Sequence, residues 1–193
     1  MNLKHNKSEI LLQGISLLRQ QGYHHTGIKD ILNACGIPKG SFYNFFKSKE
    51  DFASQALHLY GNSILQLIQK FSRNEDLAPL ERLQQYFELL IRANEEEEMR
   101  YGCLVMSLSS ELAGYNDHFA EQTQIIFGQW IQELAYCIEL GQNDGSVRMD
   151  YLASDLAEFL YTAVFGSFAR SKSIRNSQSL KLILHTTLDF LSA

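Results

Sequence analysis

The chain has 193 residues and a net charge of −5, and its hydrophobic content of 45% is enough to form a folded core. It contains neither a long apolar run nor a secretory leader, so we expect no membrane span and a cytoplasmic location. Its three cysteines are widely spaced and form no C-x-x-C pair, so we expect no disulfide framework and no metal site. We also expect no cofactor.

The charge is unevenly distributed along the chain. Residues 1–52 carry seven basic and four acidic side chains, a net +3, whereas the remainder carries ten basic and eighteen acidic side chains, a net −8. A basic N-terminal segment on an acidic body favours approach to a phosphate backbone in one orientation. The N-terminal segment can therefore bind a polyanion although the chain as a whole is acidic.

Three helices are predicted near the N-terminus. The stretch 9–21 repeats apolar residues at helical spacing, and Gly22 is placed to end this helix in a left-handed conformation. Thr26 is placed to cap a second helix with the sequence GIKDILNAC. Pro38 is placed to begin a brief third helix, PKGSFYNFF, because its missing N–H costs nothing in the first helical turn.

The rest of the chain also has helical periodicity. Ser48 is placed to cap a fourth helix that runs to about Phe71. Further helices are predicted over roughly 79–97, 103–114, 116–141, 150–172 and 177–191, with a break at 141–145. No stretch alternates apolar and polar residues for long enough to indicate a strand. We therefore predict an all-α protein with about nine helices.

The second and third predicted helices have the pattern of a helix-turn-helix. They are joined by a short turn around Gly36 and follow an amphipathic helix. In such a motif the third helix enters the major groove, where Lys39 can reach a phosphate or a guanine edge. Tyr43 and Asn44 are further candidates, whereas the three phenylalanines are expected in the core (Phe42, Phe45 and Phe46). An ordinary helical hairpin with a solvated basic face fits the same spacing.

The segment TGIKDILNACGIPKGSFYNFFKSKEDF resembles the DNA-binding segment of TetR/AcrR-type regulators, most specifically in G-x-x-K-G-S-F-Y-x-x-F-x-S-K-E. The resemblance covers about residues 6–55. It implies a homodimer with two domains: residues 1–50 bind a palindromic operator in double-stranded DNA, and residues 51–193 bind an effector and dimerise through the last two helices. The DNA-facing positions that it implies are Thr26, Gly27, Lys39, Gly40, Ser41, Tyr43, Asn44 and Lys49.

The last two predicted helices carry apolar stripes that suit an interface between subunits. One stripe includes Leu156, Leu160, Ala163 and Val164, and the other includes Leu180, Ile183, Leu184, Thr187, Leu188 and Leu191. Two such helices from each subunit can form a four-helix interface. The same stripes can instead pack only within one subunit.

Cys103 follows a glycine at a predicted helix start, where the helix dipole and the nearby Arg100 favour the thiolate that oxidants and electrophiles attack. The stretch GCLVMSLSSEL resembles the NemR-like, cysteine-containing subgroup of these repressors. That resemblance implies a response to reactive electrophiles and oxidants, with Lys172 near the thiol. The other interpretation is a packing cysteine, because free cysteine is among the most buried residue types.

A non-covalent effector pocket is the second hypothesis for the body. Its candidate residues are apolar and aromatic side chains from several predicted helices, namely Met106, Phe127, Trp130, Tyr161 and Phe165. We predict a repressor that a small molecule, or modification of Cys103, releases from its operator.

Two other classes of protein compete with this prediction. The chain has no nucleophile elbow, phosphate-binding loop or metal-ligand cluster, so we do not expect an enzyme. A thiol-dependent enzyme built on Cys103 would need a base that the sequence does not show nearby. The stronger alternative is an architectural DNA-binding protein without an effector, although the long body over residues 51–193 favours regulation.

Overall fold

A computed structural model describes residues 6–193. Lys4, one of the seven basic residues of the N-terminal segment, lies outside the described residues, as do the other first residues that bear on the expectation of no secretory leader. The described chain forms nine α-helices: α1 (Lys7–His25), α2 (Ile28–Cys35), α3 (Lys39–Phe45), α4 (Lys49–Ser72), α5 (Pro79–Glu96), α6 (Leu104–Leu112), α7 (Asp117–Asp144), α8 (Ala153–Ile174) and α9 (Gln178–Leu191). This confirms the predicted all-α fold.

Other secondary structure is sparse. Within residues 6–193 the only β interaction is an isolated bridge between Val147 and Ser192. None of the helices in this range is both long and apolar enough to cross a membrane.

The chain divides into two compact units. Unit 1 contains α1, α2, α3 and α6 together with the first parts of α4 and α7. Unit 2 contains α5, α8 and α9 together with the remaining parts of α4 and α7. The chain passes between the units within α4 after Ser63 and within α7 after Ile126, so both helices belong to the two units in turn.

Most predicted helix ends agree with the structure, but the cap of α2 does not. Ser48 caps α4 as predicted, because its Oγ accepts the N–H of Asp51 at 3.0 Å. The N-cap of α2 is Gly27, and Thr26 instead donates its hydroxyl to the carbonyl oxygen of Gly22 at 2.7 Å. The prediction that Thr26 caps α2 is therefore wrong, because its hydroxyl is occupied by the end of α1.

The C-terminal end of α7 lies later than the sequence pattern suggests. The predicted break covers residues 141–145, whereas α7 continues to Asp144. The chain turns at Gly145, whose φ of 82° is one that L side chains rarely adopt.

Three aromatic rings form the centre of unit 1. Phe42, Phe46 and Phe52 are almost fully buried, and the rings of Phe42 and Phe46 and those of Phe46 and Phe52 have centroids 5.1 Å apart. Gly14 in α1 faces this cluster so closely that a Cβ there would overlap the Phe52 ring. The glycine therefore lets α1 approach the aromatic cluster, and the predicted core role of Phe42 and Phe46 is confirmed.

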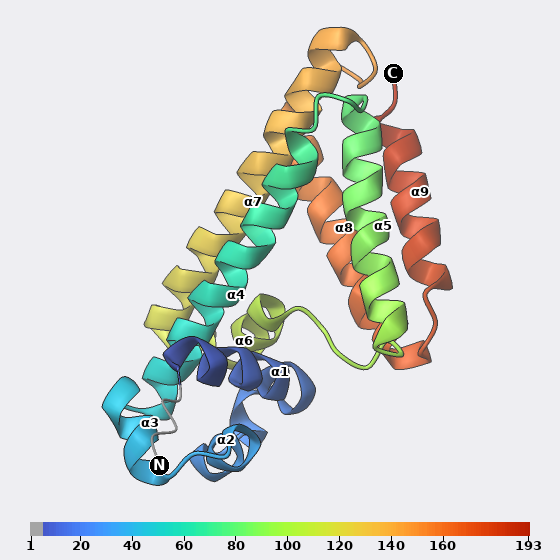
Figure 1. Ribbon diagram of the computed structural model, residues 1–193. Coiled ribbons are helices and arrows are strands. Elements are labelled where there is room, and N and C mark those ends of the chain that lie inside the picture. The colour runs from blue at the N-terminus through green and yellow to red at the C-terminus, as the bar shows by residue number, and fades with distance from the viewer. Residues whose placement is uncertain (1–5) are drawn as a thin grey trace. The chain divides into compact units, whose positions relative to one another are not determined.

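Unit 2 is a helical bundle in which α9 packs against both α8 and α5 (Figure 1). Most of the stripe residues predicted for an interface between subunits are buried within this single chain: Leu156, Leu160, Val164, Leu180, Leu184, Thr187 and Leu191. Helical periodicity cannot distinguish a core-facing stripe from an interface-facing one, and here the bundle itself covers these side chains. The prediction that these stripes meet a second subunit is therefore wrong for the buried positions.

Candidate nucleic-acid interface and ligand-binding surfaces

Helix α3 has one buried and one exposed face. Phe42 holds it against the core of unit 1, whereas Lys39, Gly40 and Asn44 are exposed and Tyr43 is 47% exposed. The Lys39 Nζ lies 5.9 Å from the centroid of the Tyr43 ring, so these two side chains occupy the same open face. This face offers a cation, a phenol and an amide, the groups that contact phosphates and base edges.

The turn before α3 fixes how this helix leaves α2. Gly36 has a φ of 63°, and its N–H and that of Ile37 donate to the carbonyl oxygens of Asn33 and Leu32 at 3.3 and 3.0 Å. Cys35 in this turn is half-buried, and burial raises the pKa of its thiol. The geometry is that of a helix-turn-helix held by backbone hydrogen bonds and by buried Ile37.

The two predicted contacts at the start of α2 already have partners within the protein. The Thr26 side chain is completely buried, and the N–H of Gly27 donates to Oδ2 of Asp30 at 2.8 Å. These groups therefore position α2 rather than present free donors. Lys29 and Lys47 are two further exposed lysines in the same unit. They were not named from the sequence as DNA-contacting candidates, although their positive charge could have indicated that role.

Ser41 and Lys49 are both half-buried. The Lys49 Nζ lies 4.1 Å from the centroid of the Tyr23 ring, a cation–π contact between the start of α4 and the end of α1. Burial lowers the pKa of the Lys49 ammonium, while the carboxylates of Glu111 and Asp30 oppose this shift. Lys49 therefore links the start of α4 to the end of α1 in addition to carrying positive charge.

Cys103 is the N-cap of α6 in unit 1, but its thiol does not have the expected acidity. Burial raises the pKa of this thiol and outweighs hydrogen bonds from the Met106 and Val105 backbone and from Tyr60. Arg100, which was expected to favour the thiolate, forms an ion pair with Glu98 at 2.6 Å. Desolvation is therefore the larger effect on the pKa of this thiol, and it opposes the expected dipole-stabilised thiolate.

The other candidate effector residues fall into both units. Lys172 is exposed on α8 in unit 2, and Met106 is half-buried on α6 in unit 1. The four aromatic candidates come together in unit 2: Phe127 and Trp130 of α7 meet Tyr161 and Phe165 of α8. Tyr161 and Phe165 stack with centroids 4.2 Å apart, and Trp130 is fully buried.

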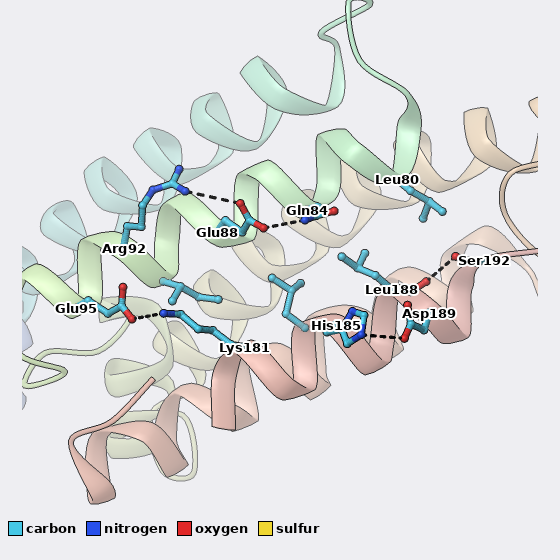
Figure 2. Close-up of a pocket in the computed structure, with 12 residues that line it drawn as sticks. Leu80, Gln84, Glu88, Arg92, Glu95, Lys181, His185, Leu188, Asp189 and Ser192 are labelled. Carbon is cyan, nitrogen blue, oxygen red and sulfur yellow. Dashed lines mark hydrogen bonds and ion pairs between the residues drawn. The ribbon is translucent and has the colours of Figure 1, made fainter. Parts of the chain in front are cut away.

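A groove between α5 and α9 in unit 2 was not predicted from the sequence (Figure 2). Its volume is about 840 Å³, and it is lined by Leu80, Gln84, Glu88, Ile91, Arg92, Glu95, Lys181, Leu184, His185, Leu188, Asp189 and Ser192. Its two walls are far apart in the sequence, so only the packing of α9 on α5 brings them together.

Charged side chains along this groove are paired. Glu95 accepts from Lys181 at 2.6 Å, and Arg92 lies 3.7 Å from Glu88 (Figure 2). The hydrogen bond from Lys181 lowers the pKa of Glu95, and a hydrogen bond from Ser177 and the positive charge of Arg92 lower it further. The groove is therefore an amphipathic surface in which aliphatic side chains lie between charged side chains that form ion pairs.

An exposed apolar surface covers part of α8 and α9. Phe159, Leu182 and Phe190 are 47%, 61% and 38% exposed, and the Phe159 and Phe190 rings have centroids 5.2 Å apart. Gly166 and Ala169 are exposed on α8 and leave room for close approach of another helix. We define Phe159, Gly166, Ala169, Leu182 and Phe190 as the α8–α9 surface.

Comparisons with known proteins agree with this geometry. The family model for bacterial regulatory proteins of the tetR family matches residues 10–56, and the tetracyclin repressor-like C-terminal domain matches residues 79–187. The HTH-type transcriptional repressor DhaR of Mycobacterium sp. (strain GP1) is 32% identical over 96% of this chain and 91% of its own.

Two solved structures share the fold over nearly the whole chain. The regulatory protein TetR from Rhodobacter sphaeroides has a TM-score of 0.91 and 26% identity over 95% of this chain and 97% of its own. Reduced NemR of E. coli has a TM-score of 0.88 and 22% identity over 96% of each chain, a likeness of fold.

Proposed function

The chain belongs to the TetR family of transcriptional regulators, and we propose that it is a repressor that leaves its operator when an effector binds or when Cys103 is modified. In this proposal residues 1–50 bind a palindromic operator, and residues 51–193 bind the effector and form the homodimer. Repression is supported by the relative from Mycobacterium sp. (strain GP1), which is named a repressor.

The observation that carries the proposal is the division of α3 into a buried and an open face. Phe42 locks the helix in place, so Lys39, Tyr43 and Asn44 project from a rigid support. Preorganised side chains lose little conformational entropy on binding, which favours sequence reading over loose electrostatic attachment.

Dimerisation through the α8–α9 surface is supported by its exposed aromatic and aliphatic side chains. Small residues Gly166 and Ala169 suit the close helix packing of a four-helix interface. A twofold dimer matches a palindromic operator, with the two α3 helices roughly 34–36 Å apart in successive major grooves.

The effector is proposed to act on unit 2. The cluster of Phe127, Trp130, Tyr161 and Phe165 is apolar, so a ligand there would be an apolar or aromatic molecule that separates the stacked rings. Because α4 and α7 continue from unit 2 into unit 1, a shift of either helix reaches the helix-turn-helix along the chain itself.

The proposal is tested by selecting duplexes from a random DNA library with the wild-type protein and measuring affinity by fluorescence anisotropy. Lys39→Ala is expected to weaken binding of the selected duplex by about tenfold or more, because a specific base or phosphate contact is lost. Lys70→Ala removes another exposed lysine, in α4, and serves as the matched control, with affinity close to wild type.

Equal affinity of the two lysine variants would contradict the assignment of α3. Equal binding of selected and unrelated duplexes would instead support an architectural DNA-binding protein.

For Cys103, a mild thiol oxidant is applied to the wild type and to Cys103→Ser. Release of the wild type alone supports modification of Cys103, whereas indifference of both assigns release to a non-covalent effector.

A further inference from the structure

The C-terminal end of α1 contains a break in its helical backbone. Gly22 has a φ of 78° and a ψ of 173°, so its positive φ agrees with the sequence prediction but its ψ is extended. A break in a helix leaves the next backbone N–H groups without their helical acceptors. Tyr23 and His24 follow the break directly, and the segment then leads through Thr26 into α2.

A carboxylate from α6 satisfies both of these N–H groups. The N–H of Tyr23 donates to Oε1 of Glu111, and the N–H of His24 donates to Oε2 of the same side chain, each at 3.1 Å. Hydrogen bonds to an ionised carboxylate are stronger than those between neutral groups, and the two-point contact also fixes orientation. Glu111 therefore acts as an N-cap for the residues after the break, although it lies 88 residues beyond Tyr23 and 87 residues beyond His24 in the sequence.

The shape of the junction between α1 and α2 matches this carboxylate. A Cβ on Gly22 would lie 2.6 Å from Oε1 of Glu111, so the glycine makes room for the contact. Next to it, the Tyr115 hydroxyl lies 2.8 Å from Nε2 of His24, a second bond between the α6–α7 connection and the end of α1. Both bonds hold the same short segment.

This segment sets the start of the helix-turn-helix. The Thr26 hydroxyl donates to the carbonyl oxygen of Gly22, and α2 begins two residues later at Ile28. Cys103 and Glu111 lie at opposite ends of α6, about 12 Å apart along the helix at 1.5 Å per residue. A displacement of α6 as a rigid element would therefore move the cap of the α1–α2 junction with it.

We propose that Glu111 is a positioning residue for DNA binding, which couples α6 to the helix-turn-helix through its carboxylate on the Tyr23 and His24 amides. The inference rests on the proposed function, because it assumes that α2 and α3 must be held in one orientation to read an operator.

The decisive variant is Glu111→Gln, with Glu121→Gln as the matched control on an exposed glutamate of α7. Both changes remove one negative charge, which by itself strengthens attraction to DNA of any sequence. Loss of the cap predicts the opposite for the selected duplex, an affinity about tenfold weaker, because one oxygen is replaced by a donor that faces an N–H. Affinity for unrelated DNA is expected to stay the same or rise.

A second measurement does not depend on DNA. Hydrogen–deuterium exchange is expected to speed up by about tenfold at the Tyr23 and His24 amides in Glu111→Gln, while the amides of residues 10–18 keep wild-type rates. Tyr115→Phe removes only the outer bond to His24 from an exposed side chain, so it folds even if Glu111→Gln does not. It is expected to weaken operator binding by about twofold to threefold.

The outcomes separate the two proposals. Failure of the wild-type protein to select any duplex overturns the proposed function, whereas the exchange rates still test the cap. Unchanged exchange at the two amides in Glu111→Gln, or the same operator affinity in Glu111→Gln as in Glu121→Gln, overturns the role of Glu111. Weaker operator binding together with faster local exchange and an unchanged circular dichroism spectrum supports it.

Discussion

At the scale of single residues, burial decides the chemistry more than sequence neighbours do. Cys103 begins a helix, which stabilises a thiolate, yet desolvation raises the pKa of its thiol. Cys137 shows the same effect, because burial raises its pKa to about 12; its thiol donates to the Pro79 carbonyl oxygen at 3.3 Å. Desolvation therefore favours the protonated form of both thiols.

This predicts slow alkylation of Cys103 in the folded protein. At pH 7 its reaction with iodoacetamide should be slower than in the urea-unfolded chain, because the raised pKa lowers the fraction of reactive thiolate. The rate should keep rising with pH beyond the usual thiol range. Peptide-resolved mass spectrometry measures this at all three cysteines, and a rate that levels off below pH 7 would contradict it.

At the scale of elements, helix-interior glycines differ in what surrounds them. In α1, Gly14 faces the Phe52 ring so closely that any side chain would overlap it. In α7, Gly128 has no neighbouring atom within 4 Å of the position that a Cβ would take. The first glycine is required by packing, and the second only weakens its helix.

The two glycines therefore predict changes of opposite sign. Gly14→Ala should lower the free energy of unfolding by about 1–3 kcal/mol, because it overpacks the aromatic cluster of unit 1. Gly128→Ala should raise it by about 0.5–1 kcal/mol, because alanine has the higher helix propensity. Urea denaturation monitored by circular dichroism measures both, and destabilisation by both variants would show that local packing does not control the effect.

At the scale of the whole molecule, the proposed dimer depends on residues that this chain leaves exposed. Leu182 in α9 is 61% exposed, and Leu12 in α1 has almost the same exposure, 60%. Only Leu182 belongs to the α8–α9 surface. The two leucines therefore form a matched pair in which the same substitution tests one helix face against another.

We predict that Leu182→Glu raises the dimer dissociation constant by about 100-fold or more, because a charge buried without a partner costs about 3–5 kcal/mol. The variant should also bind the selected palindrome more weakly, because two separate subunits no longer bind the two half-sites as one dimer. Leu12→Glu should sediment with the dimer mass of the wild type. Analytical ultracentrifugation measures both, and an intact Leu182→Glu dimer would place the interface on another face.

The sequence by itself determined the helices, the helix-turn-helix and the family. These features depend on local signals: helical periodicity, the cap at Ser48, the glycine in the turn before α3, and the pattern G-x-x-K-G-S-F-Y. Such signals act over a few residues, so they can be recognised without a structure. The core role of Phe42 and Phe46 followed from the same periodicity.

The tertiary structure decided what each stripe and each polar group contacts. Leu160 and Leu184 have the periodicity of an interface, yet the bundle buries them within one chain. Thr26 has the chemistry of a cap, but the break at Gly22 gives its hydroxyl another acceptor. Glu111 reaches the end of α1 from another helix, and no local sequence pattern can predict a contact between residues so far apart in the chain. Packing and desolvation depend on segments that are distant in sequence, so only the tertiary structure decides them.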